Sequence, residues 1–128
     1  LVFVDPGGGV PCDDHVIAPR QSPEERRAYL SELGRLLERG QSVVACHYVD
    51  PSEQPPVQAA SAMDEVHEAL DVQPLATVRA PRDTTRMFVV LPHPRHRSDL
   101  EDRLGALQLS RWGDELRLDR WHRERALA

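Results

Sequence analysis

One stretch of the sequence, Ser22 to Pro51, predicts a helix that leads directly into a buried strand. Ser22 and Glu25 have the spacing of a capping box, and Pro23 stands at the first helical position, where a missing N–H costs nothing. Apolar residues then recur every three or four positions, at Tyr29, Leu30, Leu33, Leu36 and Leu37. Gly40 favours a left-handed end to this helix. We therefore predict one amphipathic helix that begins after Ser22 and ends before Gly40.

The strand that follows, Val43 to Val49, has apolar residues on both of its alternating faces, which predicts a central strand covered on both sides. In an open α/β sheet, ligands gather beyond the carboxyl end of such a strand. The candidate ligand-binding residues there are Cys46, His47, Tyr48 and Asp50. The alternative is a core strand whose cysteine is a small hydrophobic residue and whose histidine and tyrosine are hydrogen-bonded packing residues.

The length of the chain predicts a single domain, residues 1–128, in which residues 1–21 form a partly irregular N-terminal arm. The sequence holds only two cysteines, Cys12 and Cys46, and no secretory segment, so we expect a cytoplasmic protein. No apolar run approaches the roughly 20 residues that a membrane helix needs. We therefore expect no membrane association.

Charge is distributed unevenly along the chain. Residues 1–74 hold 5 arginines against 13 acidic residues, a net charge of −8, whereas residues 75–128 hold 11 against 8, a net charge of +3. This asymmetry predicts a polarised surface that meets a protein partner or a second copy of the chain. Nucleic-acid binding is not expected, since it would need the arginines on one surface, with Trp112 and Trp121 as stacking platforms.

The rest of the chain predicts a second helix, four strands and one further short helix. Val57, Ala60, Met63, Val66 and Leu70 mark the buried face of a helix, and Gln58 falls on its polar face. The later elements are strands at Leu75–Ala80 and Met87–Leu91 joined as a hairpin, a short helix capped by Ser98 and Glu101, and strands at Leu107–Trp112 and Glu115–Asp119 around a Gly113-Asp114 turn.

From Ser42 onward the predicted order is strand, helix, strand, strand, helix, strand. This is the order of a ferredoxin-like split βαβ sandwich, so we predict an α+β fold of that kind with an extra N-terminal helix. The alternative is a small open α/β sheet, which is favoured if Leu1–Val4 pairs in parallel with Val43–Val49.

Arginines in the second half of the chain suggest an anion site for phosphate or carboxylate. Its candidate residues are Arg79, Arg82, Arg95 and Arg97, with Arg86 nearby and backbone amides at the helix start beside Ser98. The alternative is a basic surface that keeps an acidic protein soluble.

Two residue groups resemble partial metal sites. His93 and His96 stand near Asp99, and Cys12 with His15 could meet Cys46 and His47. Neither group has the ligand spacing of an established metal motif, so we expect no metal and no other cofactor.

The helix and strand between Ser22 and Gln54 resemble the opening segment of quinolinate synthase, in which a similar helix leads to a strand ending Ala-His-Tyr-Tyr-x-Asp-Pro. Aligned on Ala45 and Asp50-Pro51, Cys46 takes the place of the substrate-binding histidine of the family, and Tyr48 matches a tyrosine. The resemblance implies three repeated α/β lobes and an iron–sulfur cluster held by three cysteines. It covers only residues 22–54 of 128, and no cysteine follows Cys46.

Two functional hypotheses follow from the sequence. The first is a non-catalytic interaction or regulatory domain, because the chain shows no nucleophile motif and no phosphate-binding loop. The second is a small enzyme or ligand-binding domain for an acidic small molecule, in which Cys46, His47 and Tyr48 act together with the arginines. The sequence leaves enzymatic activity open and favours the first hypothesis.

Overall fold

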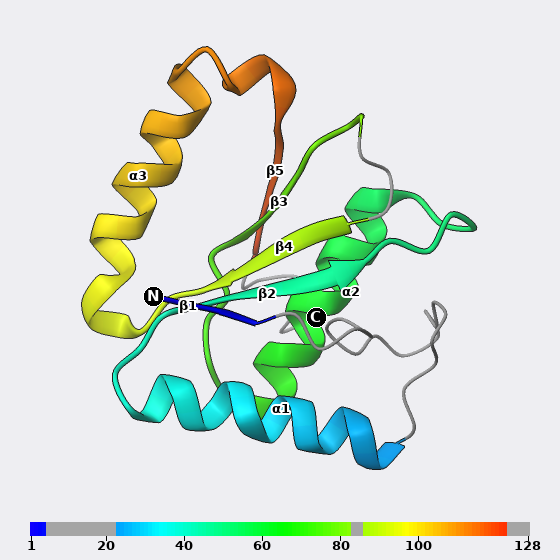
Figure 1. The fold of residues 1–128 in the computed structure, drawn as a ribbon, viewed down its shortest axis with the longest axis vertical. Helices are drawn as coiled ribbons and strands as arrows, with labels where there is room; N and C mark the ends of the chain where they lie inside the picture. Colours follow the sequence, from blue (N-terminus) through cyan, green and yellow to red (C-terminus); the bar gives the residue numbers. More distant parts are fainter. Residues whose placement is uncertain (5–22, 83–85, 123–128) are drawn as a thin grey trace.

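The computed structural model describes residues 1–4, 23–82 and 86–122, which form five strands and three α-helices (Figure 1). In chain order these are β1 (Val2–Val4), α1 (Pro23–Glu38), β2 (Val43–Tyr48), α2 (Pro55–Leu70), β3 (Ala76–Arg79), β4 (Arg86–Leu91), α3 (Arg97–Leu109) and β5 (Arg117–Arg120). Two short 3-10 turns, η1 (Pro94–His96) and η2 (Gly113–Glu115), flank α3. This mixture confirms the predicted α+β class. The predicted N-terminal arm, with its Cys12–His15 pair, lies outside the described residues except for β1.

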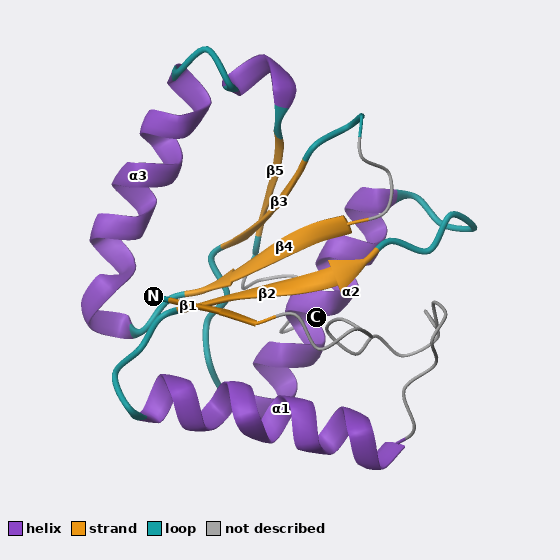
Figure 2. Cartoon of the chain, in the orientation of Figure 1, coloured by secondary structure: helices purple, strands orange, loops and turns teal. Residues whose placement is uncertain are grey.

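All five described strands form one open mixed sheet in the order β1-β2-β4-β3-β5 (Figure 2). β1 runs parallel to β2, with Val2 opposite Val43, and every other neighbouring pair is antiparallel. The predicted hairpin of β3 and β4 is present, with Thr77 opposite Val89. The parallel pairing of β1 with β2 is the feature that favours the open-sheet alternative.

The position of β5 differs from a ferredoxin-like sheet, in which the last strand would lie beside β2. Here β1 occupies that edge, and β5 pairs with β3 at the opposite edge. The connection from β2 to β3 and the connection from β4 to β5 both move toward the β5 edge of the sheet. β2 and β3 run in one direction, however, and β4 and β5 run in the opposite direction. Crossovers of the same hand then place α2 and α3 on opposite faces.

Adjacent residues of β4 show this two-sided packing. Val89 is buried in the larger cluster with Leu33 of α1 and Met63 of α2, whereas Val90 is buried in a smaller cluster with Leu104 of α3. Side chains alternate between the faces of a strand, so the two clusters lie on opposite sides of the sheet. Figure 1 shows the same arrangement, with α1 and α2 on one side and α3 on the other.

The helix predicted from Ser22 is α1. Leu33 is fully buried, and Tyr29 and Leu37 are buried beside it, which confirms the predicted apolar face. Gly40 has a φ of 85°, and the Gly40 and Gln41 N–H groups donate to the Leu37 and Leu36 carbonyls, which is a Schellman ending. The predicted capping box of Ser22 with Glu25 stays a prediction, because Ser22 lies outside the part of the chain that the structure describes.

The predicted buried face of α2 was wrong at its start. Val57 is 51% exposed, while Gln58, assigned to the polar face, is fully buried together with Ala59, Ala62, Met63 and Val66. The burial of Gln58 is compensated, because its amide exchanges hydrogen bonds with the backbone of the preceding loop. Hydrophobic patterning does not detect a polar residue that is buried for this reason.

Two predictions for the region after β4 were also wrong. Ser98 lies inside the first turn of α3, which begins at Arg97, so it is not a cap. The first half of the predicted strand Leu107–Trp112 belongs to the same helix, which continues to Leu109 and packs Leu100 and Leu104 against the sheet at helical spacing. β5 therefore pairs with β3 and not across a Gly113-Asp114 turn.

Trp121 attaches the end of β5 to α2. Its indole N–H donates to the Asp64 carboxylate at 2.9 Å, and its ring lies 4.7 Å from the imidazole of His67, measured between centroids. His67 in turn lies 2.8 Å from the Val72 carbonyl oxygen through Nδ1. Trp121 is thus a buried packing residue.

Within the described residues, no helix is long and apolar enough to cross a membrane.

Candidate functional site

The residues predicted at the carboxyl end of β2 do not converge on one site. Cys46 and His47 are both buried, with exposed fractions of 0% and 1%, and as neighbours on a strand they point to opposite faces of the sheet. Tyr48 is half-buried, and the guanidinium of Arg86 lies 5.6 Å from its ring centroid. A cavity of about 420 Å³ opens at this end of the sheet, and of the four predicted residues only Asp50 lines it.

Asp50 organises the loop between β2 and α2. Its Oδ1 accepts hydrogen bonds from the backbone N–H of Ser52 at 2.9 Å and from the Ser52 hydroxyl at 2.7 Å. Its own N–H donates to Oε1 of Gln58 at 2.8 Å. Arg79 and Arg86 line the same cavity together with Glu53, so charges of both signs meet there. A net anion-binding character does not follow from this mixture.

The four predicted anion-binding arginines lie in two pairs at opposite ends of β3. Arg79 closes β3 and its Nε lies 3.6 Å from Asp119, and the Arg82 Nε lies 3.7 Å from Glu115. Beyond the other end, Arg97 donates to the carbonyls of Gln73 at 2.8 Å and Pro74 at 3.4 Å. The structure therefore does not bring these four residues into one site.

Arg95 has a structural contact of the same kind as Arg97. Its guanidinium donates to the carbonyl of Gly40 at 3.0 Å and so binds the negative end of α1. The sequence gives no signal for this contact, since it joins residues that are 55 positions apart.

A buried serine holds the segment between β4 and α3. The Ser42 hydroxyl accepts the His93 N–H at 2.9 Å and lies 2.9 Å from Nδ1 of His96. The imidazole centroids of His93 and His96 are 5.8 Å apart. One ring nitrogen of each histidine is thus committed, and among the described residues no group of three or more histidine, cysteine or acidic side chains could hold a metal ion.

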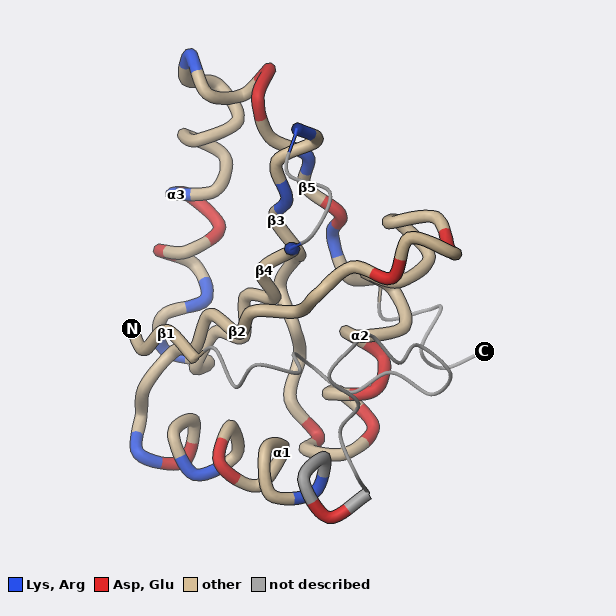
Figure 3. Tube along the Cα trace, turned by 45° about the vertical axis from the view of Figure 1, so that its right-hand side comes forward, with Lys and Arg blue, Asp and Glu red and all other residues tan. Residues whose placement is uncertain are grey.

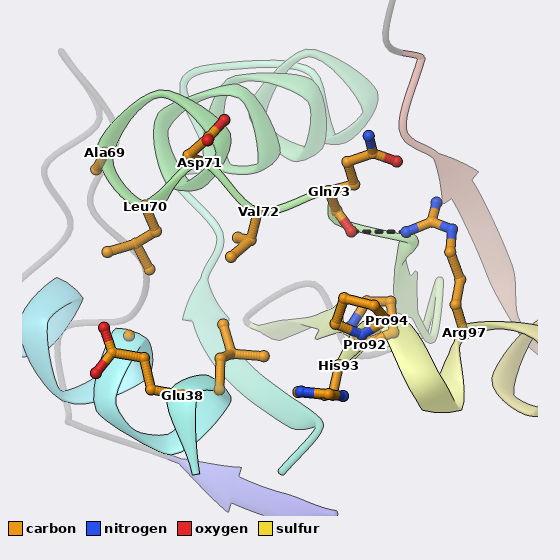
Figure 4. A pocket seen from close by; sticks show the side chains of 12 residues that line it. Glu38, Ala69, Leu70, Asp71, Val72, Gln73, Pro92, His93, Pro94 and Arg97 are labelled. Atoms are coloured by element: carbon orange, nitrogen blue, oxygen red, sulfur yellow. Dashed lines mark hydrogen bonds between the residues drawn. The ribbon is translucent and has the colours of Figure 1, made fainter. Parts of the chain in front are cut away.

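A groove of about 680 Å³ lies at the ends of α1 and α2 (Figure 4). We call it the helix-end groove, since the last turns of α1 and α2 form one side and the segment from Pro92 to Arg97 forms the other. It is lined by Gly34, Leu37, Glu38, Ala69, Leu70, Asp71, Val72, Gln73, Pro92, His93, Pro94 and Arg97. None of the residues predicted at the end of β2 belongs to it.

The turn after α3 forms a second feature that the sequence analysis missed. Leu109 is 91% exposed and Trp112 is 53% exposed, and the Arg111 guanidinium lies 5.1 Å from the Trp112 ring centroid. We call Leu109, Arg111, Trp112 and Asp114 the α3 corner. The wrong prediction of a strand over these residues concealed it, because in a strand Trp112 would alternate into the sheet.

Ser110 and Gly113 fix the shape of the α3 corner. The Ser110 hydroxyl donates to the Leu107 carbonyl at 2.6 Å and accepts the Trp112 N–H at 3.2 Å. The Gly113 N–H donates to the Ser110 carbonyl at 2.9 Å, and a side chain at Gly113 would collide with the carbonyl oxygen of Gln108. The exposed side chains therefore project from a turn whose backbone is held by hydrogen bonds.

Figure 3 shows how charge is distributed over these features. Acidic positions follow one another along α2, while α1 and α3 carry both signs. Both signs occur at the α3 corner, which contains Arg111 and Asp114.

The chain matches no protein-family model, no curated protein and no solved structure in the three comparisons that we made. The resemblance of residues 22–54 to quinolinate synthase therefore stays a prediction.

Proposed function

We propose that this chain is a non-catalytic interaction domain that pairs with a second copy of itself through the α3 corner. The exposure of Leu109 and Trp112, three positions apart on a hydrogen-bonded turn, is the observation that carries the proposal. Single exposed apolar residues are ordinary, but tryptophan and arginine together are the types that dominate binding energy at protein interfaces. The corner presents both without needing to rearrange, which lowers the entropic cost of association.

The charges of the corner favour a second copy as the partner. Arg111 and Asp114 are both exposed and flank Trp112 in sequence. In a two-fold dimer the same patch meets itself, so Arg111 of each copy can face Asp114 of the other while the apolar side chains meet near the axis. Because the corner consists of few side chains, we expect a weak dimer that depends on concentration.

The alternative, binding of an acidic small molecule, has less support. Cys46 and His47 are buried on opposite faces, and Arg95 and Arg97 are bound to backbone carbonyls.

A cytoplasmic location is part of the main proposal and rests on the cysteine usage of the sequence.

Sedimentation equilibrium of the chain and of Trp112→Ala tests the proposal. We expect wild-type association to increase with protein concentration, and we expect Trp112→Ala to weaken it by about tenfold or more, which corresponds to about 1.4 kcal/mol. Val57→Ala is the matched control, since Val57 is 51% exposed on α2, away from the corner. A wild-type chain that stays monomeric up to about 1 mM, or equal effects of the two substitutions, would contradict the proposal.

A further inference from the structure

The helix-end groove has the composition of a small-molecule site: apolar walls with a few polar groups at fixed positions. Leu37, Leu70, Val72 and Pro92 supply apolar wall, and the volume of about 680 Å³ suits a compact organic molecule. In Figure 4, the Glu38 carboxylate stands at one edge and the Arg97 side chain at the opposite edge, with the His93 ring between them.

Hydrogen bonds hold the rim of the groove on each side. The α1 side ends in the Schellman turn at Gly40, and the α2 side ends at Asp71, whose φ is 53° and whose N–H donates to the His67 carbonyl at 2.9 Å. The facing segment is attached to Ser42 through the His93 N–H. A site that is already formed avoids part of the ordering cost of binding.

The positive charge of Arg97 is already compensated at the groove. Its terminal nitrogens donate to the carbonyls of Gln73 and Pro74, and its Nε lies 3.6 Å from Glu101. Figure 4 shows the guanidinium directed at the Gln73 carbonyl oxygen, at the rim of the groove. Arg97 therefore serves as a clamp and contributes little attraction for an anion.

The groups that remain favour a cation. Glu38 is an exposed carboxylate that lines the groove. α2 ends there, so the negative pole of its helix dipole faces the groove, whereas the corresponding pole of α1 is already bound by Arg95. The Nδ1 of His93 accepts the Arg95 N–H at 3.3 Å, so this ring nitrogen is already hydrogen-bonded within the chain.

We propose that the helix-end groove binds a small molecule that carries a protonated amine on an apolar body. The apolar part lies against Leu70, Val72 and Pro92, and the ammonium lies at the Glu38 edge. This site is separate from the α3 corner and does not depend on dimer formation.

Titration of the ¹⁵N-labelled chain with three matched indoles tests this assignment by amide chemical shifts. Tryptamine, tryptophol and indole-3-acetate share one ring and differ in bearing an ammonium, a hydroxyl or a carboxylate. We expect tryptamine to bind most tightly, with shifts centred on the amides of residues 69–73 and of His93, and indole-3-acetate to bind least. A carboxylate probe that binds as tightly as tryptamine, or tryptamine shifts centred elsewhere, overturns the proposal.

Glu38→Gln tests whether the Glu38 carboxylate is the charge that attracts the ammonium group of the ligand. We expect it to weaken tryptamine binding about two- to fivefold, the range of an exposed ion pair, and to leave tryptophol binding unchanged. Glu32→Gln removes the same charge from α1 at a position that does not line the groove, and its binding should equal that of the wild type. Equal losses in both variants would show that general electrostatics and not the groove attracts the amine.

Discussion

The burial of apolar residues in this chain follows a local sequence rule, whereas the roles of its buried or bonded polar residues depend on contacts beyond the local pattern. Apolar side chains at helical spacing, such as Leu33 and Leu37, could be predicted as buried because the rule is local. The roles of Gln58, Arg95 and Arg97 could not, since each side chain bonds to backbone groups, and for the two arginines these groups are supplied by distant segments. The structural role of a polar side chain depends on its hydrogen-bond partner, and the sequence alone does not identify that partner.

Gly40 combines a left-handed backbone conformation with a hydrogen bond from the distant Arg95 side chain. Its φ of 85° disfavours a side chain, and a Cβ there would collide with the Arg95 guanidinium, which now binds the Gly40 carbonyl. We expect Gly40→Ala to lower the free energy of unfolding by about 1–2 kcal/mol, measured from denaturant midpoints. Gly105→Ala is the control, because a Cβ there meets nothing within 4 Å, and it should raise stability by about 0.5–1 kcal/mol. Equal effects of the two variants would refute the φ argument.

Cys46 is the predicted site residue that burial tests most simply. Its exposed fraction is 0%, so an alkylating reagent should reach it only when the chain unfolds. We expect labelling of Cys46, followed by peptide mass analysis in a Cys12→Ser background, to rise with denaturant along the unfolding curve. Rapid labelling of the native chain would instead support the hypothesis that Cys46 belongs to an accessible ligand-binding site.

At the level of elements, the prediction was accurate where local sequence patterns alone determine the secondary structure. α1, α2, β2 and the β3–β4 hairpin were predicted from apolar periodicity and turn residues. α3 was predicted too short, because Gly113-Asp114 resembles a hairpin turn while the leucines before it have helical spacing. Packing of Leu104 against β3 and β4 decides between these signals, and that contact is not local.

The burial of α1 against the sheet is tested by one truncation. Leu33 is fully buried in the larger cluster, so Leu33→Ala should lower the free energy of unfolding by about 2–5 kcal/mol. Leu36→Ala removes the same atoms from a half-buried position of the same helix and should cost less. Thermal or denaturant unfolding that showed equal losses would mean that α1 does not pack through the Leu33 face.

At the level of the whole molecule, strand order was the part that sequence could not decide. The order of elements fits both a ferredoxin-like sheet and the observed one, and only the pairing of β1 with β2 moves β5 to the far edge. The position of β5 places α3 on its own face of the sheet, with its end exposed. The four predicted anion-binding arginines are separated by the β3–β4 hairpin, because Arg79 and Arg82 lie at and beyond the end of β3 while Arg95 and Arg97 follow the end of the antiparallel β4.

The central claim is that two α3 corners pair about a two-fold axis, with Arg111 of one copy facing Asp114 of the other. Reversing one charge, as in Arg111→Asp or Asp114→Arg, places like charges opposite each other, and each variant alone should therefore be monomeric.

Mixing these two variants is the most direct test. In the mixed dimer every facing pair is again of opposite sign, so sedimentation equilibrium should show association restored to the wild-type level, and weaker as salt is raised. A mixture that stays monomeric while the wild-type chain associates would contradict the two-fold pairing of the α3 corners.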